Sequence, residues 1–541
     1  MSKALPRWVV CVFFAAFLAL GLVTAGDYGP TWDEPTEMDI LRMNLWEYAR
    51  TLGLDESRFE ALAAIDDPLN SDPLCPISQS IERDHGAALF YPLAGVVMDP
   101  ALSEGSRSLL WHMGCWCIFT LGALALYGAL RRLGLSRGWS LLGPLFLLLS
   151  PLFFAHGHFN NKDISLMAMT LCTLWSALTL AERPNIARGL IFSLCGAFAA
   201  NTKIAGLAVW GLCALYVLVR LLVEKRLTLR VLGLAVMVIV SFLCFYALLT
   251  PALWAGPLAF LEYLIFNTFS FQRWNGYILF RGAIFYTPTQ PLPWYYLPYM
   301  LFATTPLWVL LLCAVGTLVA LCSAVRHLRA TPGPGLALLL VVLLWMLPLG
   351  AAVITHTHVY NGWRHFYFVY GPLLILAVWG MHALWRHTRQ KRLLAVLVGL
   401  CMLWSGVGLV TQHPYQYVYY QPLVQLKGAG YNELDYWNVS ARNALLQLAE
   451  TCDGPLPIEP ADMWSNHALQ KSLVTLPEEV QARFVCLPEG GGARFVLSNP
   501  TYACFSGFSP EADMTECVTL SAYGQPIMAL YERTAKEADR P

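Results

Sequence analysis

The stretch WVVCVFFAAFLALGLVTAGDYGPTWDEP, residues 8–35, joins a long apolar run to a pair of adjacent acids. Residues 8–26 carry no charge, and their number is close to the roughly 20 residues that an α-helix needs to cross a bilayer. Asp33 and Glu34 follow within a few residues. Because carboxylates are costly in or beside hydrocarbon, an acidic pair at a membrane face is a candidate functional site.

The whole chain has the composition of a membrane protein. Of its 541 residues 57% are hydrophobic and 13% are charged, whereas soluble domains average about 25% charged residues. The net charge is zero, so the overall balance does not favour nucleic acid as a partner. We predict about eleven helical spans, near residues 8–26, 108–130, 139–155, 164–181, 189–202, 204–222, 231–250, 296–322, 336–355, 366–385 and 393–410.

The first apolar run also fits a cleaved signal peptide, since Lys3 and Arg7 precede it and small residues lie near Ala25. We favour a retained span. The run is long for the core of a signal peptide, and cleavage there would leave Asp33 on a loose end.

Lysines and arginines predict the orientation in the membrane, because they gather in cytoplasmic segments. With the N-terminus inside, sixteen of them fall in the inner segments. The short outer segments hold few: Lys162, Lys203, Arg273, Arg281 and Arg364. We therefore predict a cytoplasmic N-terminus and, after eleven spans, a C-terminus outside; a bacterial inner membrane fits this arrangement.

The predicted fold is an α-helical polytopic membrane protein with two parts. Residues 1–410 form the transmembrane domain, which includes a large outer loop at 27–107, and residues 411–541 form a small mixed α/β domain outside the membrane. In that second domain a helix is predicted at 435–450 and strands at 494–497 and 527–531.

Cysteine positions fit an outer location for the second domain. Ten of the fifteen cysteines lie in or at the ends of predicted spans, where the residue behaves as a small apolar side chain. Cys452, Cys486, Cys504 and Cys517 lie in the tail. In an oxidising compartment four cysteines can staple a small domain, so we expect at least one disulfide among them.

Two polar segments accompany the acidic pair on the predicted outer face. Asp84 and His85 precede an apolar stretch that we place on the membrane surface. HGHFNNKD, residues 156–163, lies between two spans and includes Asn161, Lys162 and Asp163. A metal site made by its two histidines and its aspartate is one interpretation, and polar contacts to a sugar or a phosphate are the one we favour.

A third segment, HTHVYNGWRHFY at residues 356–367, contains Arg364 and His365. An arginine on the outer face opposes the charge bias and needs an anion. A lipid headgroup is one partner, and a phosphorylated substrate is another, because the guanidinium fork binds phosphate bidentately.

These segments resemble a known family. Trp32-Asp33-Glu34 resembles the acidic motif that opens the first outer loop of protein O-mannosyltransferases. Residues 84–89 stand where those proteins carry an Asp-x-His-Pro-Pro-Leu-like segment, here without the prolines. Residues 158–163, 361–367 and 413–419 resemble bacterial members of glycosyltransferase family 39, which is related to the lipid A aminoarabinose transferases. The resemblance covers about residues 8–440.

The resemblance implies a GT-C fold, a polyprenyl-phosphate sugar donor and transfer on the outer face of the membrane. In such a reaction the enzyme takes a proton from the acceptor hydroxyl and neutralises charge on the departing phosphate. We predict Asp33 as the base of an inverting single displacement, with Glu34 as the alternative base or as a group that orients the acceptor. Arg364, or Lys162 as second choice, would hold the phosphate.

The other predicted site residues share the outer face. His365, Asn161 and Asp163 are expected to contact the donor, and Asp84 and His85 the acceptor or its loop. The scheme requires no cofactor or metal, although a divalent metal stays possible. The acceptor is not identified by the sequence, and the alternatives to an enzyme are a multi-span transporter or lipid flippase and a non-catalytic scaffold.

Overall fold

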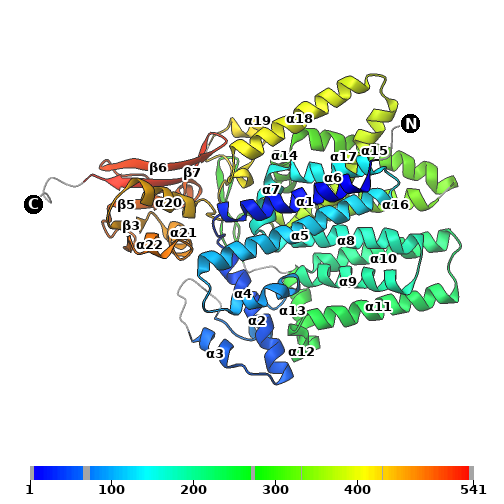
Figure 1. Cartoon of the computed structure of the whole chain (residues 1–541), viewed down its shortest axis with the longest axis horizontal. Helices are drawn as coiled ribbons and strands as arrows, with labels where there is room; N and C mark the ends of the chain where they lie inside the picture. Colours follow the sequence, from blue (N-terminus) through cyan, green and yellow to red (C-terminus); the bar gives the residue numbers. More distant parts are fainter. Residues whose placement is uncertain (1–4, 65–72, 270–273, 331, 429, 535–541) are drawn as a thin grey trace, which may run out of the picture.

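The computed structural model describes residues 5–64, 73–269, 274–330, 332–428 and 430–534. The predicted fold class is confirmed: a bundle of long apolar helices carries a small domain with a β-sheet at its C-terminal end. Figure 1 shows this sheet at one end of the bundle and the N-terminus at the other end. Arg273, one of the outer cations named above, lies outside the described residues.

Within the described residues nine helical segments are long and apolar enough to cross a membrane. Their helices are α1 (Arg7–Thr24), α5 (Glu104–Arg132), α8 (Asp163–Glu182), α10 (Ala205–Val223), α11 (Leu229–Leu249), α15 (Leu307–Ala330), α16 (Pro332–Ile354), α17 (Tyr370–His387) and α18 (Lys391–Thr411).

Two of the predicted spans, those at 139–155 and 189–202, are not single long helices. α6 (Arg137–Leu148) and α7 (Pro151–Phe159) form one broken span that is bent by 73°. Pro151 stands at the start of α7. A first-turn residue needs no N–H for a helical hydrogen bond, so the proline is tolerated there, whereas it prevents the preceding helix from continuing. α9 (Ile186–Thr202) has only 17 residues, and it packs against α8, α10 and α11.

Burial orders the helices from the centre of the bundle outward. α8 is the central helix, since 94% of its apolar window is buried, whereas α18 has 6% and α11 has 11% of the window buried. The exposed apolar faces of α11 and α18 are consistent with contact with lipid. The first residue of the central helix, Asp163, is one of the predicted site residues.

Small residues allow α15 and α17 to pack closely. A Cβ atom at Gly316 would lie 1.8 Å from the Leu376 carbonyl oxygen, and one at Gly380 would lie 2.1 Å from the Leu312 carbonyl oxygen. Only glycine fits at these two positions, as is common where membrane helices approach through their backbones.

The loop at 27–107, which was predicted to lie outside the membrane, contains helices. It contains α2 (Glu34–Leu52), α3 (Ser57–Ala63) and α4 (Ala94–Met98). Asp33 is the N-cap residue of α2 and Pro35 stands in the first turn, a position that suits proline because its missing N–H is not needed there. The acidic pair is therefore the start of a helix.

The second long connection contains further short elements. They are α12 (Ala252–Ala255), α13 (Pro257–Phe269), the antiparallel hairpin β1 (Tyr277–Phe280) and β2 (Ala283–Tyr286), and α14 (Tyr296–Thr304). The predicted span at 296–322 is thus divided between α14 and α15, with Pro306 at the break.

The C-terminal domain is the predicted mixed α/β structure. Its five-stranded sheet has the order β4-β3-β5-β7-β6, with β3 parallel to β4 and β5, and β7 antiparallel to β5 and β6. Its elements are α19 (Pro422–Gln425), α20 (Ala441–Thr451), β3 (Leu456–Pro460), α21 (Met463–Leu473), α22 (Glu478–Gln481), β4 (Phe484–Cys486), β5 (Phe495–Ser498), α23 (Pro500–Ser506), β6 (Met514–Ala522) and β7 (Gln525–Arg533).

The predicted helix of this domain begins later than residue 435. Asp435 turns the chain instead, because its carboxylate accepts hydrogen bonds from the N–H groups of Val439, at 3.0 Å, and Ser440, at 2.9 Å. α20 starts immediately after this turn.

The predicted disulfide in the tail is wrong: Cys452, Cys486, Cys504 and Cys517 are all free thiols. Cys486 ends β4 and Cys517 lies in β6, which are the two edge strands of the sheet. Four strand spacings separate the edges by about 19 Å, whereas bridged cysteines have Cα atoms within about 7 Å, so the pairing of Cys486 with Cys517 is excluded.

Candidate functional site

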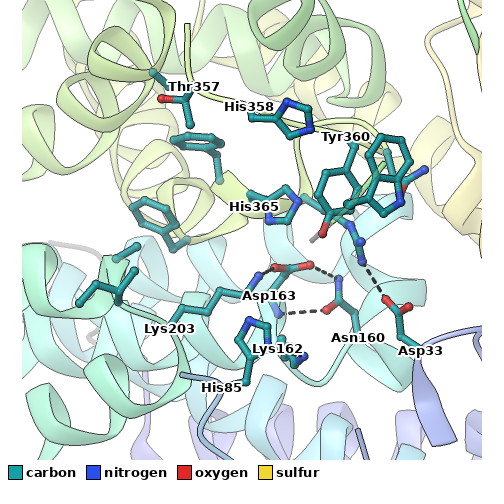
Figure 2. A pocket seen from close by; sticks show the side chains of 18 of the residues that line it. Asp33, His85, Asn160, Lys162, Asp163, Lys203, Thr357, His358, Tyr360 and His365 are labelled. Carbon is teal, nitrogen blue, oxygen red and sulfur yellow. Dashed lines mark hydrogen bonds and ion pairs between the residues drawn. The ribbon is translucent and has the colours of Figure 1, made fainter. Parts of the chain in front are cut away.

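A cavity of about 920 Å³ lies where the helical bundle meets the C-terminal domain. Its wall is formed by the start of α2, the 82–85 segment, the 160–163 turn between α7 and α8, parts of α10 and α16, residues 274–277, the 357–366 segment and the 433–437 segment. α21 and α23 add Trp464, Tyr502 and Phe505. Figure 2 shows its polar side chains converging from these elements.

Asp33 and Arg364 meet in this cavity, although 331 residues separate them in the sequence. Arg364 Nη1 donates to Asp33 Oδ2 at 3.1 Å, and Trp437 Nε1 donates to the same oxygen at 3.2 Å. The Asp33 side chain remains 41% exposed, while that of Arg364 is 10% exposed. A carboxylate with one bonded and one open oxygen can still accept a proton from a ligand.

Aromatic rings hold the Arg364 guanidinium in place. Its carbon lies 5.0 Å from the ring centre of Tyr360 and 4.8 Å from that of Trp437. The Nε atom is buried and has no hydrogen-bond partner among the described residues. A buried donor without a partner is costly, so this arginine has hydrogen-bonding capacity left for a bound anion.

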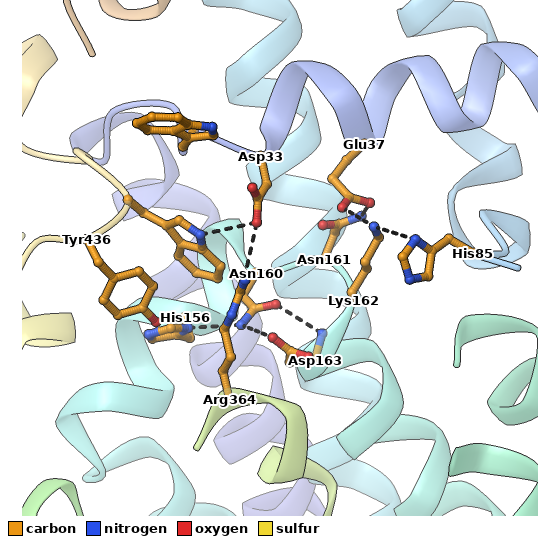
Figure 3. A network of polar contacts seen from close by, with 12 residues as sticks. Asp33, Glu37, His85, His156, Asn160, Asn161, Lys162, Asp163, Arg364 and Tyr436 are labelled. Atoms are coloured by element: carbon orange, nitrogen blue, oxygen red, sulfur yellow. Dashed lines mark hydrogen bonds and ion pairs between the residues drawn. The ribbon is translucent and has the colours of Figure 1, made fainter. Parts of the chain in front are cut away.

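Lys162 belongs to a second network (Figure 3). Its Nζ atom forms an ion pair of 2.5 Å with Glu37 and lies 3.2 Å from His85 Nδ1. Asn161 Nδ2 donates to the other oxygen of Glu37 at 2.9 Å. Burial acts to lower the pKa of Lys162, but the carboxylates of Glu37 and Glu82 outweigh it and raise the pKa, so the ammonium group stays charged.

Asp163 is the centre of a third network. It forms an ion pair with Lys203, and its other oxygen accepts from Asn160 Nδ2 at 3.1 Å. The Asn160 side chain in turn accepts from the Asp163 backbone N–H at 3.0 Å and lies 3.0 Å from His156 Nδ1. Asp163 therefore orders the turn at the start of α8 and neutralises one of the cations of the cavity.

The C-terminal domain holds the turn that carries Asp33. Lys471 Nζ donates to the Trp32 carbonyl oxygen at 2.7 Å, and the ring of His467 stacks on the Trp32 indole at 4.8 Å. The Trp32 backbone N–H donates to the Trp437 carbonyl at 3.1 Å. The position of the carboxylate thus depends on the tail as well as on α2.

An apolar arm extends this cavity between two membrane helices. α10 contributes Ala208, Val209 and Leu212, and α16 contributes Leu344 and Leu347. Cations and carboxylates at the helix ends are therefore continuous with an apolar surface inside the bundle.

Eight of the nine predicted site residues line this cavity: Asp33, Asp84, His85, Asn161, Lys162, Asp163, Arg364 and His365. Glu34 does not. It is 2% exposed and its Oε2 atom lies 2.8 Å from His112 Nε2 on α5. Successive residues of a helix point about 100° apart, so the start of α2 directs Asp33 and Glu34 to different surroundings.

Sequence reasoning missed four members of the wall: Glu37, Lys203, Glu433 and Trp437. The spacing of Asp33 and Glu37 was a usable signal, because residues four apart lie on one face of a helix. Lys203 was visible as an outer cation but was not placed in the site. The last two come from the 433–437 segment, in which no site residue was predicted.

The described residues hold no group of three His, Cys, Asp or Glu side chains that could bind a metal ion. The interpretation that joined His156, His158 and Asp163 fails on geometry. His156 lies beside Asn160, whereas His158 stacks between Tyr28, at 4.5 Å, and Trp116, at 4.4 Å. Residues two apart on a helix point to nearly opposite sides.

No known family model matches the sequence, and no curated protein matches it either. Solved structures with a similar fold include ArnT from Cupriavidus metallidurans in the apo state, with 14% identity, coverage of 97% of both chains and a TM-score of 0.49. An oligosaccharyltransferase from Archaeoglobus fulgidus has 11% identity, coverage of 99% of this chain and 76% of its own, and a TM-score of 0.43.

Arabinofuranosyltransferase AftD from Mycobacteria is a third similar structure. It has 12% identity, coverage of 99% of this chain and 40% of its own, and a TM-score of 0.39.

Proposed function

We propose that this protein is a membrane glycosyltransferase that moves a sugar from a polyprenyl-phosphate donor to an acceptor hydroxyl group. One observation carries the proposal: a single cavity joins an apolar arm between α10 and α16 to Arg364, Lys162, Lys203 and the carboxylate of Asp33. A lipid-linked phosphosugar has chemical groups that match these parts in the same order: an apolar chain, an anionic phosphate and an electrophilic anomeric carbon.

The donor phosphate belongs beside Arg364. The guanidinium keeps its Nε donor unused and can bind phosphate as a fork. Lys162 and Lys203 already form ion pairs with Glu37 and Asp163. Most of their positive charge is therefore neutralised within the protein, and they attract the phosphate less than Arg364 does. His365 Nε2 is a further buried atom without a partner among the described residues, and it lines the same cavity.

Asp33 serves as the base in this scheme. The acceptor oxygen attacks the anomeric carbon while its proton passes to the Asp33 carboxylate. The bond from the anomeric carbon to the phosphate oxygen breaks, and the electron pair leaves with polyprenyl phosphate. Arg364 stabilises the charge that grows on that phosphate. A single displacement of this kind inverts the configuration at the anomeric carbon.

The position of the cavity favours this function over transport. Transporters bind substrate near the middle of the membrane. The charged part of this cavity lies at the ends of the helices, and its wall includes Trp464, Tyr502 and Phe505 of the C-terminal domain, so a ligand in that part is covered by the domain.

A direct assay tests the proposal. We expect purified protein in detergent to release or transfer radiolabelled sugar from at least one member of a panel of polyprenyl-phosphate hexoses and pentoses. The matched control is the Asp33→Asn variant, which keeps the cavity and loses the base. Equal, slow release by both proteins from every donor would contradict a glycosyltransferase function.

The charge bias of the sequence predicts which side of the membrane holds the site. A phosphatase reporter that works only outside the cytoplasm is expected to be active when fused after residue 541 and inactive when fused at residue 228, in the turn between α10 and α11. The opposite pattern would place Asp33 and Arg364 on the cytoplasmic side and refute the outer-face site.

A further inference from the structure

One carboxyl group of the cavity differs from the others in its surroundings. Asp33, on the α2 turn, faces an arginine, and the carboxylates of Glu37 and Asp163 each face a lysine. Glu433 lines the same cavity and is 4% exposed. Its side chain forms no ion pair among the described residues. Its Oε1 accepts a long hydrogen bond, of 3.4 Å, from Asn361 Nδ2, and the carboxyl group also has a hydrogen bond with the Leu279 backbone.

The backbone of Glu433 is fixed on both sides. Its N–H donates to the Leu279 carbonyl oxygen at 3.2 Å, and its own carbonyl accepts from the Tyr420 hydroxyl at 2.7 Å. The side chain thus enters the cavity from a segment that is anchored to β1 and to the connection after α18. A carboxyl group held this way has little freedom to find another partner.

Burial raises the pKa of Glu433 to about 8, although the hydrogen bond from Asn361, the charge of Arg364 and a hydrogen bond with the Leu279 backbone all lower it. The other titratable groups that surround this carboxyl are the phenols of Tyr296, Tyr420, Tyr436 and Tyr502. At pH 7 Glu433 is therefore mainly a neutral acid, which has one O–H to donate.

We propose that Glu433 is a donor-binding residue whose neutral carboxyl group donates a hydrogen bond to an oxygen of the polyprenyl phosphate. The inference rests on the proposed function. A carboxylic acid kept neutral by an apolar site can serve as a hydrogen-bond donor to an oxyanion. Glu433 adds such a donor beside Arg364 without adding a negative charge next to the phosphate, and no bond is formed or broken at this residue.

The sign of the pH dependence follows from the neutral form. Below pH 8 the O–H is present; as the pH rises through about 8 it is lost, and the carboxylate that replaces it repels the phosphate. The second ionisation of a phosphate monoester is near pH 6, so the ligand does not change charge between pH 7 and 9. Lys162, whose pKa is raised, also keeps its charge over that range.

Binding of undecaprenyl phosphate to the purified full-length protein tests the inference. For the wild type we expect affinity to fall by about tenfold between pH 7 and 9, as the neutral fraction of an acid with this pKa does. Glu433→Gln keeps an N–H donor and cannot ionise, so its affinity is expected to stay constant over the range. Glu433→Ala should bind weakly at both pH values.

Glu516→Gln is the matched control, because Glu516 is an exposed residue of β6, and it should follow the wild type. Wild-type binding that is independent of pH, or an unchanged profile in Glu433→Gln, would refute the role of Glu433 and leave the proposed function standing. If the wild type does not bind undecaprenyl phosphate at any pH, the proposed function itself fails.

Discussion

Replacing Asp33 by asparagine is expected to lower sugar transfer by at least two orders of magnitude, since general-base catalysis contributes about 10²- to 10⁴-fold. The amide is nearly isosteric and can still accept hydrogen bonds from Arg364 and Trp437, which hold the carboxylate at 3.1 and 3.2 Å. It cannot take the proton of the acceptor. Donor binding should therefore be largely kept while kcat falls, which is measured with saturating donor and varied acceptor.

Two comparisons make this result specific to Asp33. Asp55→Asn is the same substitution at an exposed residue of the same outer loop, and it should leave transfer unchanged. Glu34→Gln removes a buried partner of His112, so we expect it to affect folding or yield more than the chemical step. If Asp33→Asn transfers sugar at the normal rate, the acid at the start of α2 is not the base.

The helical part of this fold follows from hydropathy, because uninterrupted apolar runs leave a backbone in lipid with no alternative to a helix. Features that depend on how one helix or strand packs against another cannot be predicted from hydropathy. α9 was predicted as a short segment, residues 189–202, but its packing against α8, α10 and α11 is seen only in the structure. The tail cysteines suggested a bridge, and the strand order places Cys486 and Cys517 on opposite edges.

The candidate site, too, could be predicted from the sequence only in part. Arg364 and Lys162 were predicted because they oppose the charge bias, and this signal is local. The partnership of Arg364 with Asp33 joins positions 331 residues apart, and the bond from Trp437 to the same carboxylate crosses 404 residues. Glu433 was hidden because nothing in the sequence around it shows that it is buried.

Replacing Arg364 by lysine keeps the positive charge and removes the fork. We expect the apparent KM for the donor to rise and kcat to fall, because the charge-assisted hydrogen bonds that lysine cannot reproduce contribute about 1.5–3 kcal/mol. That loss corresponds to a decrease of about 10- to 150-fold in kcat/KM. Lysine also loses the flat contact with the rings of Tyr360 and Trp437, which lie 5.0 and 4.8 Å from the guanidinium carbon.

Arg281→Lys is the matched control for this prediction. Arg281 was also predicted on the outer face, but it bonds the Tyr431 hydroxyl at 3.2 Å and is not part of the cavity wall, so its replacement should leave kinetics unchanged. Arg364→Ala should be worse than Arg364→Lys, since it also leaves Asp33 without its cation. Normal donor kinetics in both Arg364 variants would show that this arginine binds no substrate phosphate and would shift the role to Lys162 or Lys203, which line the same cavity.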